Sequence, residues 1–167
     1  TKITTASAAG KNVGPFAGGV LRKVTFADGV TKSLQGMFMG TTSLEEVVLP
    51  KSLKTIDQNA FKDCSSLKKL SVGKSGGENV LDTVETINAG AFNGWSSLET
   101  LTLKNVAKID SSDTNRTFGG CTSLKKVSVT GVTTTDNTGK TTLSTTIGTS
   151  AFKDNKALKE INMDTIK

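Results

Sequence analysis

The stretch FMGTTSLEEVVLPKSLKTIDQNAF, from Phe38 to Phe61, contains the pattern that decides the fold. Three apolar residues, Leu44, Val47 and Leu49, follow the first phenylalanine after six, nine and eleven positions. The last two are two residues apart, which is the spacing of side chains on one face of a β-strand. Polar residues and a proline bound this run. The stretch therefore predicts one short strand between turns, in a unit that repeats after 23 residues.

The same pattern recurs along the chain from a series of anchoring phenylalanines. These anchors are Phe16, Phe38, Phe61, Phe92, Phe118 and Phe152. Apolar residues occupy all three following positions in five copies, and the copy that begins at Phe16 is one residue shorter. Each copy is too short to bury its own apolar face, whereas stacked copies bury a continuous core. The sequence therefore predicts a β-rich repeat solenoid with a parallel sheet and about six repeats of ~23 residues.

Two spacings between anchors, of 31 and 34 residues, exceed the basic repeat. The excess falls at residues 73–82 and 130–142, which are rich in Gly, Thr, Asn or Ser. We interpret both as loop insertions that protrude from a repeat. The Thr-rich stretch 130–149 is either a flexible or hairpin-like insertion or an exposed recognition loop, because rigid scaffolds often carry function on loops.

The two ends of the chain differ from the repeats. Residues 1–15 are rich in Ala, Gly and Thr and match the repeat poorly, so we expect a cap or a linker there, followed by the solenoid over residues 16–167. A solenoid needs polar caps over its terminal core. No distinct cap is visible after the last strand, and we therefore expect the sequence to be a piece of a longer protein.

Composition excludes several function classes. The 167 residues include no His and only two Cys, and 21 Lys and Arg against 15 Asp and Glu give a net charge of +6. Without histidine, Ser-His-Asp and Cys-His catalysis and histidine metal sites are absent. Two cysteines alone cannot complete a structural zinc site. No apolar run approaches the ~20 residues of a transmembrane helix. The sequence therefore predicts no enzyme, no metal, no cofactor and no membrane insertion.

The repeated text resembles the BspA-like leucine-rich repeats of bacterial and protist cell-surface proteins. That family follows roughly Ala-Phe-x-x-Cys-x-Ser-Leu-x-x-Ile-x-Leu-Pro-x-Ser-Leu-x-x-Ile, and the stretch 38–61 reproduces it with Thr41 in place of the cysteine. The resemblance extends from Phe16 to Met163. It implies a right-handed leucine-rich-repeat superhelix in an exported surface protein used for adhesion or protein binding. The proline that follows the strand in the family pattern occurs only once here, at Pro50. The two insertions argue against a uniformly curved, horseshoe-shaped solenoid.

Residues between the apolar columns point outward and form a candidate ligand face. These residues are Lys23, Thr25, Glu46, Lys69, Ser71, Thr100, Thr102, Lys126, Ser128 and Glu160. Charges alternate along the stack, and neighbouring strands lie ~4.8 Å apart, so opposite charges attract each other between repeats. The face is either a charge ladder that supports register and solubility, or a polar surface for a ligand. It is neither uniformly basic nor lined with stacking aromatics, which argues against nucleic acid.

The two cysteines, Cys64 and Cys121, occupy the slot three residues after an anchor, and Trp95 occupies this slot in the repeat between them. Two stacking distances separate them by ~9–10 Å, whereas a disulfide needs Cα atoms within roughly 7 Å. The spacing therefore predicts two buried free thiols that pack as small apolar groups.

Three further motifs have weak chemical signals. Asp110, Asp113 and Asn115 are oxygen-rich, but their spacing does not match a calcium loop and favours a solvated turn. The stretch 115–117 fits the N-glycosylation pattern, which arises often by chance. The stretch Gly139-Lys140-Thr141 lacks the earlier glycine of a phosphate-binding loop.

These observations favour a non-catalytic adhesion or protein-interaction module, secreted or at the cell surface, that binds host or matrix proteins or acidic glycans. The net positive charge favours acidic partners. The alternative is a structural spacer or stalk within a larger surface protein. We expect an extracellular monomer with a protein or glycan ligand.

Overall fold

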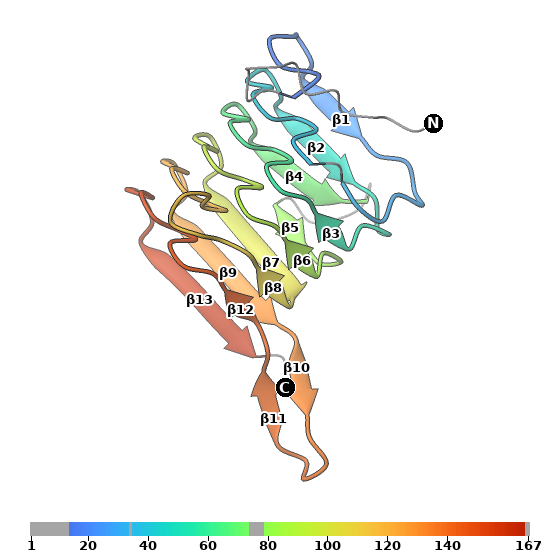
Figure 1. Cartoon of the computed structure of the whole chain (residues 1–167), viewed down its shortest axis with the longest axis vertical. Helices are drawn as coiled ribbons and strands as arrows, with labels where there is room; N and C mark the ends of the chain where they lie inside the picture. Colours follow the sequence, from blue (N-terminus) through green and yellow to red (C-terminus); the bar gives the residue numbers. More distant parts are fainter. Residues whose placement is uncertain (1–13, 34, 74–78, 166–167) are drawn as a thin grey trace.

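The computed structural model describes residues 14–33, 35–73 and 79–165. These residues form strands and turns and no helix, and successive coils stack one on another (Figure 1). The chain is therefore a β-rich repeat solenoid with parallel sheets, as the sequence predicts. The expected cap or linker at residues 1–15 lies almost entirely outside the described residues.

The strands fall into two stacks of parallel sheet and one hairpin. In chain order they are β1 (Lys23–Thr25), β2 (Glu46–Leu49), β3 (Thr55–Ile56), β4 (Lys69–Val72), β5 (Val80–Leu81), β6 (Thr86–Ile87), β7 (Thr100–Val106), β8 (Lys108–Ile109), β9 (Lys126–Gly131), β10 (Thr133–Thr135), β11 (Thr141–Leu143), β12 (Thr146–Ile147) and β13 (Glu160–Thr165). The first stack holds two ladders, β1-β2-β4 and β5-β7-β9-β13. The second stack, β3-β6-β8-β12, forms a second parallel sheet that the sequence analysis did not identify.

We expected the first insertion to be a protruding loop, but its C-terminal end is part of the sheet. Its residues Val80 and Leu81 form β5, which pairs in parallel with β7, and Asn79 lies beside β4. The Asn79 N–H donates to the Leu70 carbonyl at 2.6 Å, and the Leu70 N–H donates to Asn79 Oδ1 at 2.9 Å. The Thr102 N–H donates to the Asn79 carbonyl at 2.8 Å. The side-chain amide of Asn79 thus accepts a hydrogen bond from β4 that a strand carbonyl would otherwise accept. Asn79 therefore joins the ladder β1-β2-β4 to the ladder β5-β7-β9-β13.

The second insertion contains an antiparallel hairpin, β10 and β11, which projects from the stacked coils (Figure 1). Asp136 organises its turn: Oδ1 accepts the backbone N–H groups of Thr138 at 2.9 Å and Lys140 at 3.1 Å. These hydrogen bonds lower the pKa of Asp136, with the Thr138 hydroxyl as the largest contributor. The Thr-rich stretch therefore takes the hairpin form, one of the two that the sequence allows.

The six anchoring phenylalanines form one continuous stack of rings through the core. Successive ring centroids lie 5.3, 5.4, 5.9, 5.3 and 5.1 Å apart from Phe16 to Phe152. The four inner rings are at most 2% exposed. Offset aromatic stacking adds about 0.5–1.5 kcal/mol per pair beyond the area that the rings bury. The anchors therefore fix the spacing of the coils as well as fill the core.

The cysteine slot is a hydrogen-bond donor position, which sequence analysis did not reveal. Four of its occupants have a side-chain donor that reaches the carbonyl of the anchoring phenylalanine one coil earlier, whereas the buried hydroxyl of Thr41 has no hydrogen-bond partner among the described residues. The pairs are Cys64 Sγ to Phe38 O at 3.1 Å, Trp95 Nε1 to Phe61 O at 2.9 Å, Cys121 Sγ to Phe92 O at 3.3 Å, and Asn155 Nδ2 to Phe118 O at 2.9 Å. Both cysteines are free and buried, and burial raises the pKa of each thiol to about 12.

Two residues after each anchor, the backbone adopts a left-handed turn. Gly94 and Gly120 occupy this position with φ of 78° and 68°, and Asp63 occupies it with φ of 58°. A Cβ on Gly94 would lie 2.4 Å from Asp63 Oδ1, whereas a Cβ on Gly120 would have nothing within 4 Å. Equivalent turns in neighbouring coils therefore differ in how much space they leave for a side chain.

Candidate functional site

The predicted outward columns lie on the first stack of sheet, in the predicted register. Lys23 pairs with Glu46, and Glu46 pairs with Lys69 on β4. In the later ladder Thr100 pairs with Lys126, and Lys126 pairs with Glu160, while Thr102 lies opposite Ser128. The ten candidate residues therefore form two groups, one on β1-β2-β4 and one on β7-β9-β13, separated by β5.

Ion pairs connect neighbouring coils along this face. Lys23 Nζ lies 2.8 Å from Glu46 Oε1, and Lys126 Nζ lies 2.9 Å from Glu160 Oε1. Hydrogen bonds from Lys126 and Asn162 lower the pKa of Glu160. These side chains are largely exposed, so each pair contributes at most about 1 kcal/mol.

A second row of charges lies one residue ahead of this column. Arg22 pairs with Glu45, and Lys125 pairs with Glu99 at 3.0 Å. Each of the four acidic residues in the two rows therefore has a basic partner in an adjacent coil. This arrangement supports the charge-ladder interpretation for most of the face.

Lys68 and Lys69 depart from this ladder. Both are exposed, and neither forms an ion pair with any residue that the structure describes. Glu45 and Glu46, at the start of the preceding strand, already pair with Arg22 and Lys23 at the start of β1. A cleft of about 240 Å³ lies over β1, β2 and β4. It is lined by Arg22, Lys23, Glu45, Glu46, Lys68 and Lys69, four basic and two acidic side chains.

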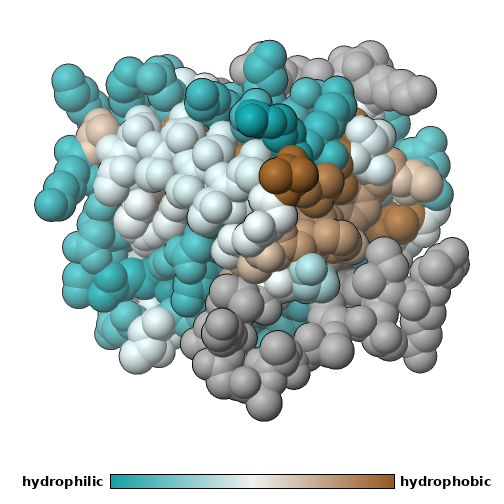
Figure 2. Space-filling model, turned by 90° about the horizontal axis from the view of Figure 1, so that it is seen from above, coloured by the Kyte–Doolittle hydropathy of each residue, from teal (hydrophilic) through white to brown (hydrophobic). Residues whose placement is uncertain are grey.

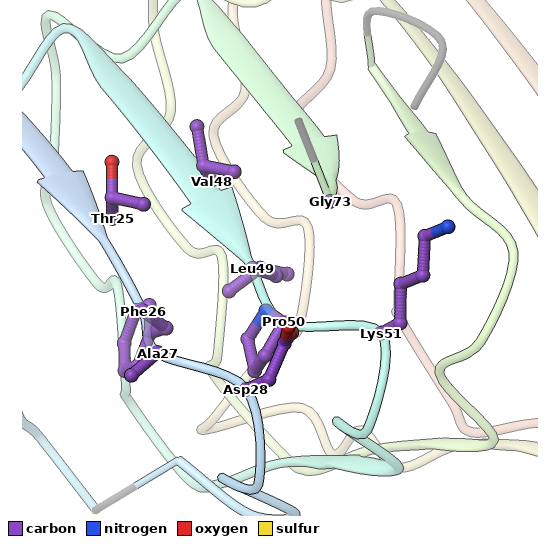
Figure 3. Close-up of a pocket in the computed structure, with 9 residues that line it drawn as sticks. All are labelled: Thr25, Phe26, Ala27, Asp28, Val48, Leu49, Pro50, Lys51 and Gly73. Atoms are coloured by element: carbon purple, nitrogen blue, oxygen red, sulfur yellow. The ribbon is translucent and has the colours of Figure 1, made fainter. Parts of the chain in front are cut away.

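A larger pocket of about 660 Å³ lies at the other end of the same strands (Figure 3). Its lining comprises Thr25, Phe26, Ala27, Asp28, Val48, Leu49, Pro50, Lys51 and Gly73. Val48, Leu49 and Pro50 are buried, whereas Thr25 and Lys51 are exposed at the rim. Sequence analysis did not identify this pocket. The available signals were Val48, an apolar residue in an otherwise polar outward column, and Pro50, the only proline that follows a strand.

The other sequence motifs are part of the structural framework. Thr117, in the glycosylation pattern, is 0% exposed, and its hydroxyl donates to the Asp110 carbonyl. Asp113 Oδ1 accepts a hydrogen bond from the Ser150 hydroxyl at 2.5 Å, and the Asn115 N–H donates to Ser112 Oγ at 3.1 Å. This turn therefore links its coil to the next one. Residues 139–141 lie in the hairpin.

The described residues contain neither a cluster of metal ligands nor a membrane-spanning helix. In residues 14–33, 35–73 and 79–165, no three or more carboxylate or thiol groups gather where they could hold a metal ion. The same segments contain no helix with the length and apolarity to cross a bilayer. The thiols with raised pKa are buried in the core, away from the cleft and the pocket.

Comparison with solved structures supports the fold. The chain is similar to the crystal structure of a leucine-rich repeat protein from Bacteroides ovatus, with a TM-score of 0.55 and 18% identity, over 92% of this chain and 44% of that one. It is also similar to a leucine rich cell surface protein from Faecalibacterium prausnitzii, with a TM-score of 0.45 and 21% identity, over 88% of this chain and 48% of that one. The chain thus spans less than half of either structure. No curated protein gives a significant match.

The sequence matches a known family of repeats. The family described as BspA type leucine rich repeat region matches residues 14–112 and 77–166, in six copies. These matches cover nearly the whole solenoid, including every anchoring phenylalanine. The chain therefore belongs to the BspA-type leucine-rich repeat family.

Proposed function

We propose that this chain is a non-catalytic protein-interaction or adhesion module, secreted or at the cell surface. It binds a host or matrix protein or an acidic glycan through the sheet face of β1, β2 and β4. The observation that carries the proposal is the basic cleft, in which Lys68 and Lys69 have no ion-pair partner among the described residues, whereas the other four charges of the lining pair with one another. Membership of a leucine-rich-repeat family supports a binding role, and an extracellular location is part of the proposal.

The scaffold behind this face is suited to binding because it is already ordered. The inward residues of β2 and β4, Val47, Leu49, Leu70 and Val72, are at most 2% exposed. A ligand therefore meets a surface whose backbone is fixed by the core, and little conformational entropy is lost on binding. The net charge of +6 favours approach of acidic ligands.

A structural spacer is the second candidate, and the later ladder favours it. On β7, β9 and β13, Lys125 pairs with Glu99 and Lys126 pairs with Glu160. A surface whose charges satisfy one another across coils gains register and solubility and needs no ligand. We place binding on the earlier ladder and the spacer role on the later one.

An array of extracellular-matrix proteins and sulfated glycans tests the proposal directly. We expect the chain to bind at least one acidic member in low salt. The binding should weaken at about 0.5 M salt, where the screening length falls to a few ångström. The double variant Lys68→Gln/Lys69→Gln should lose signal, and Lys156→Gln/Lys159→Gln, with the same net charge, should retain it. No binding to any member would support the spacer instead. Binding that salt leaves unchanged would contradict recognition through the basic cleft.

A further inference from the structure

We infer that the ligand of this face is an extended acidic protein segment that also carries a large apolar side chain. The inference rests on the proposed function and specifies the class of partner. Its carboxylates occupy the basic cleft while the apolar side chain enters the neighbouring pocket. The two cavities act as one bipartite site.

The cleft and the pocket share their strands and their face. Lys23, Glu46 and Lys69 line the cleft, whereas Thr25 and Val48, two residues further along β1 and β2, line the pocket. Side chains two residues apart point to the same face of a strand and lie ~6.6 Å apart. A peptide in extended conformation has the same repeat, so it places two side chains of one face in both cavities at once.

The cleft fits carboxylates because of its unequal charge. Glu45 and Glu46 pair with Arg22 and Lys23, which leaves the two lysines at the start of β4 to attract an additional anion. Both lysines are exposed and both line the cleft, so they present two cationic groups to it. A pair of acidic side chains, or one acidic side chain and a chain terminus, matches this arrangement.

The pocket fits an apolar side chain because of its floor. Val48 is 9% exposed and Leu49 is 0% exposed, and Phe26 forms a partly buried wall that packs edge-on against Phe38 at 6.0 Å. In Figure 3, Val48 lies above Leu49 and Phe26, and Lys51 lies to one side of them. The volume of about 660 Å³ lies within the usual range for ligand pockets, about 300–1,000 Å³.

A protein segment fits this site better than a glycan. Sugar rings commonly pack on exposed aromatic side chains, and a glycan has no apolar side chain to enter the pocket over Val48 and Phe26. This chain has no tyrosine, and its single tryptophan, Trp95, is 0% exposed. Seen from above, at the N-terminal end of the solenoid, the molecule shows apolar residues beside hydrophilic ones (Figure 2).

A peptide library displayed on phage, selected on the whole chain, tests the inference. We expect enriched sequences with two acidic residues and one large apolar residue within about four positions, the span that an extended segment covers between the cavities. Synthetic copies of the enriched peptides then give dissociation constants by fluorescence anisotropy. A heparin-derived oligosaccharide serves as the glycan probe in the same assay.

Two pairs of matched variants separate the halves of the site. Lys68→Gln/Lys69→Gln should weaken peptide binding about 5- to 20-fold, as expected for the loss of two exposed charge pairs, while Lys156→Gln/Lys159→Gln should not. Thr25→Trp, which places a bulky indole at the rim of the pocket, should weaken binding by about tenfold or more. Thr102→Trp, in the same column on β7, should leave it unchanged. Thermal unfolding of each variant checks that it folds.

The outcomes distinguish this inference from the broader proposal. Peptides without acidic residues, or peptide binding that Thr25→Trp leaves intact, would overturn the inference. So would binding of the oligosaccharide that depends on Lys68 and Lys69 but not on the pocket, although this result would uphold a binding function. Failure of both the array and the library to give any ligand would overturn both.

Discussion

Asn79 provides the sharpest test of how the two ladders are joined. Replacing it by alanine removes the Oδ1 acceptor and leaves the Leu70 N–H, in a residue that is 0% exposed, without its partner. An unsatisfied buried donor costs about 1–3 kcal/mol. Asn79 also has φ of 59°, and a left-handed conformation costs alanine about 1 kcal/mol or more. We expect Asn79→Ala to lower the free energy of unfolding by about 2–4 kcal/mol.

Asn105→Ala is a matched control for this variant. Asn105 has φ of 60°, and its side chain donates to the Asp82 carbonyl at 3.0 Å, but this hydrogen bond is exposed to solvent. Alanine there incurs the same backbone strain without a buried unpaired donor. We therefore expect the loss at position 105 to be about 1–2 kcal/mol, well below the loss at position 79.

Equilibrium denaturation with urea measures both losses. The single tryptophan, Trp95, is 0% exposed, so its fluorescence reports the opening of the central coils, and far-ultraviolet circular dichroism reports the sheets. Because repeat proteins can lose cooperativity, the slope with denaturant must be compared between variants. Equal losses for Asn79→Ala and Asn105→Ala would refute the role of Asn79 as a buried link between the ladders.

Three other predictions follow from the core, the turns and the charge ladder. Cys64 and Cys121, with a pKa of about 12, should not react with a thiol reagent at pH 8 in the native protein, and both should react in denaturant. Gly94→Ala should lower the melting temperature more than Gly120→Ala, because only the former brings a Cβ against the aspartate of the preceding coil. The pKa of Glu160 is lowered, so the stabilisation that it provides is present above its usual pKa of 4.5 and is lost as pH falls through the native value. Titration by nuclear magnetic resonance should give a midpoint below 4.5, and a midpoint at or above it would contradict the ion pair.

The periodic features of the fold could be predicted because each copy supports the others. The register of Lys23, Glu46 and Lys69 follows directly from the position of each residue relative to its anchor. The donor slot could not be recognised in this way, because Cys64 and Trp95 share a hydrogen-bond donor and not a size or hydropathy. The second sheet was missed because its strands are only two residues long, too short to show alternation.

The features that occur only once needed the three-dimensional structure. β5 follows a stretch without apolar periodicity, and its place in the sheet depends on one asparagine side chain. The pocket depends on Pro50 and Val48 of one coil meeting Phe26 of the preceding one. Sequence analysis identified three residues of the cleft, Lys23, Glu46 and Lys69. It could not show which charges would remain unpaired, since that depends on which neighbour each side chain reaches.

The inserted strand also explains why the solenoid departs from a uniform curve. β5 lies between β4 and β7 in the first stack, whereas β3 pairs directly with β6 in the second. Two strand spacings, ~9.6 Å, on one side therefore face one spacing, ~4.8 Å, on the other. The coils must fan apart on the side of the candidate face, and the Phe61–Phe92 step, at 5.9 Å, is the longest in the ring stack. A short ligand on β1, β2 and β4 lies wholly on one side of this bend, whereas a long ligand that also contacts β7 and β9 must follow it.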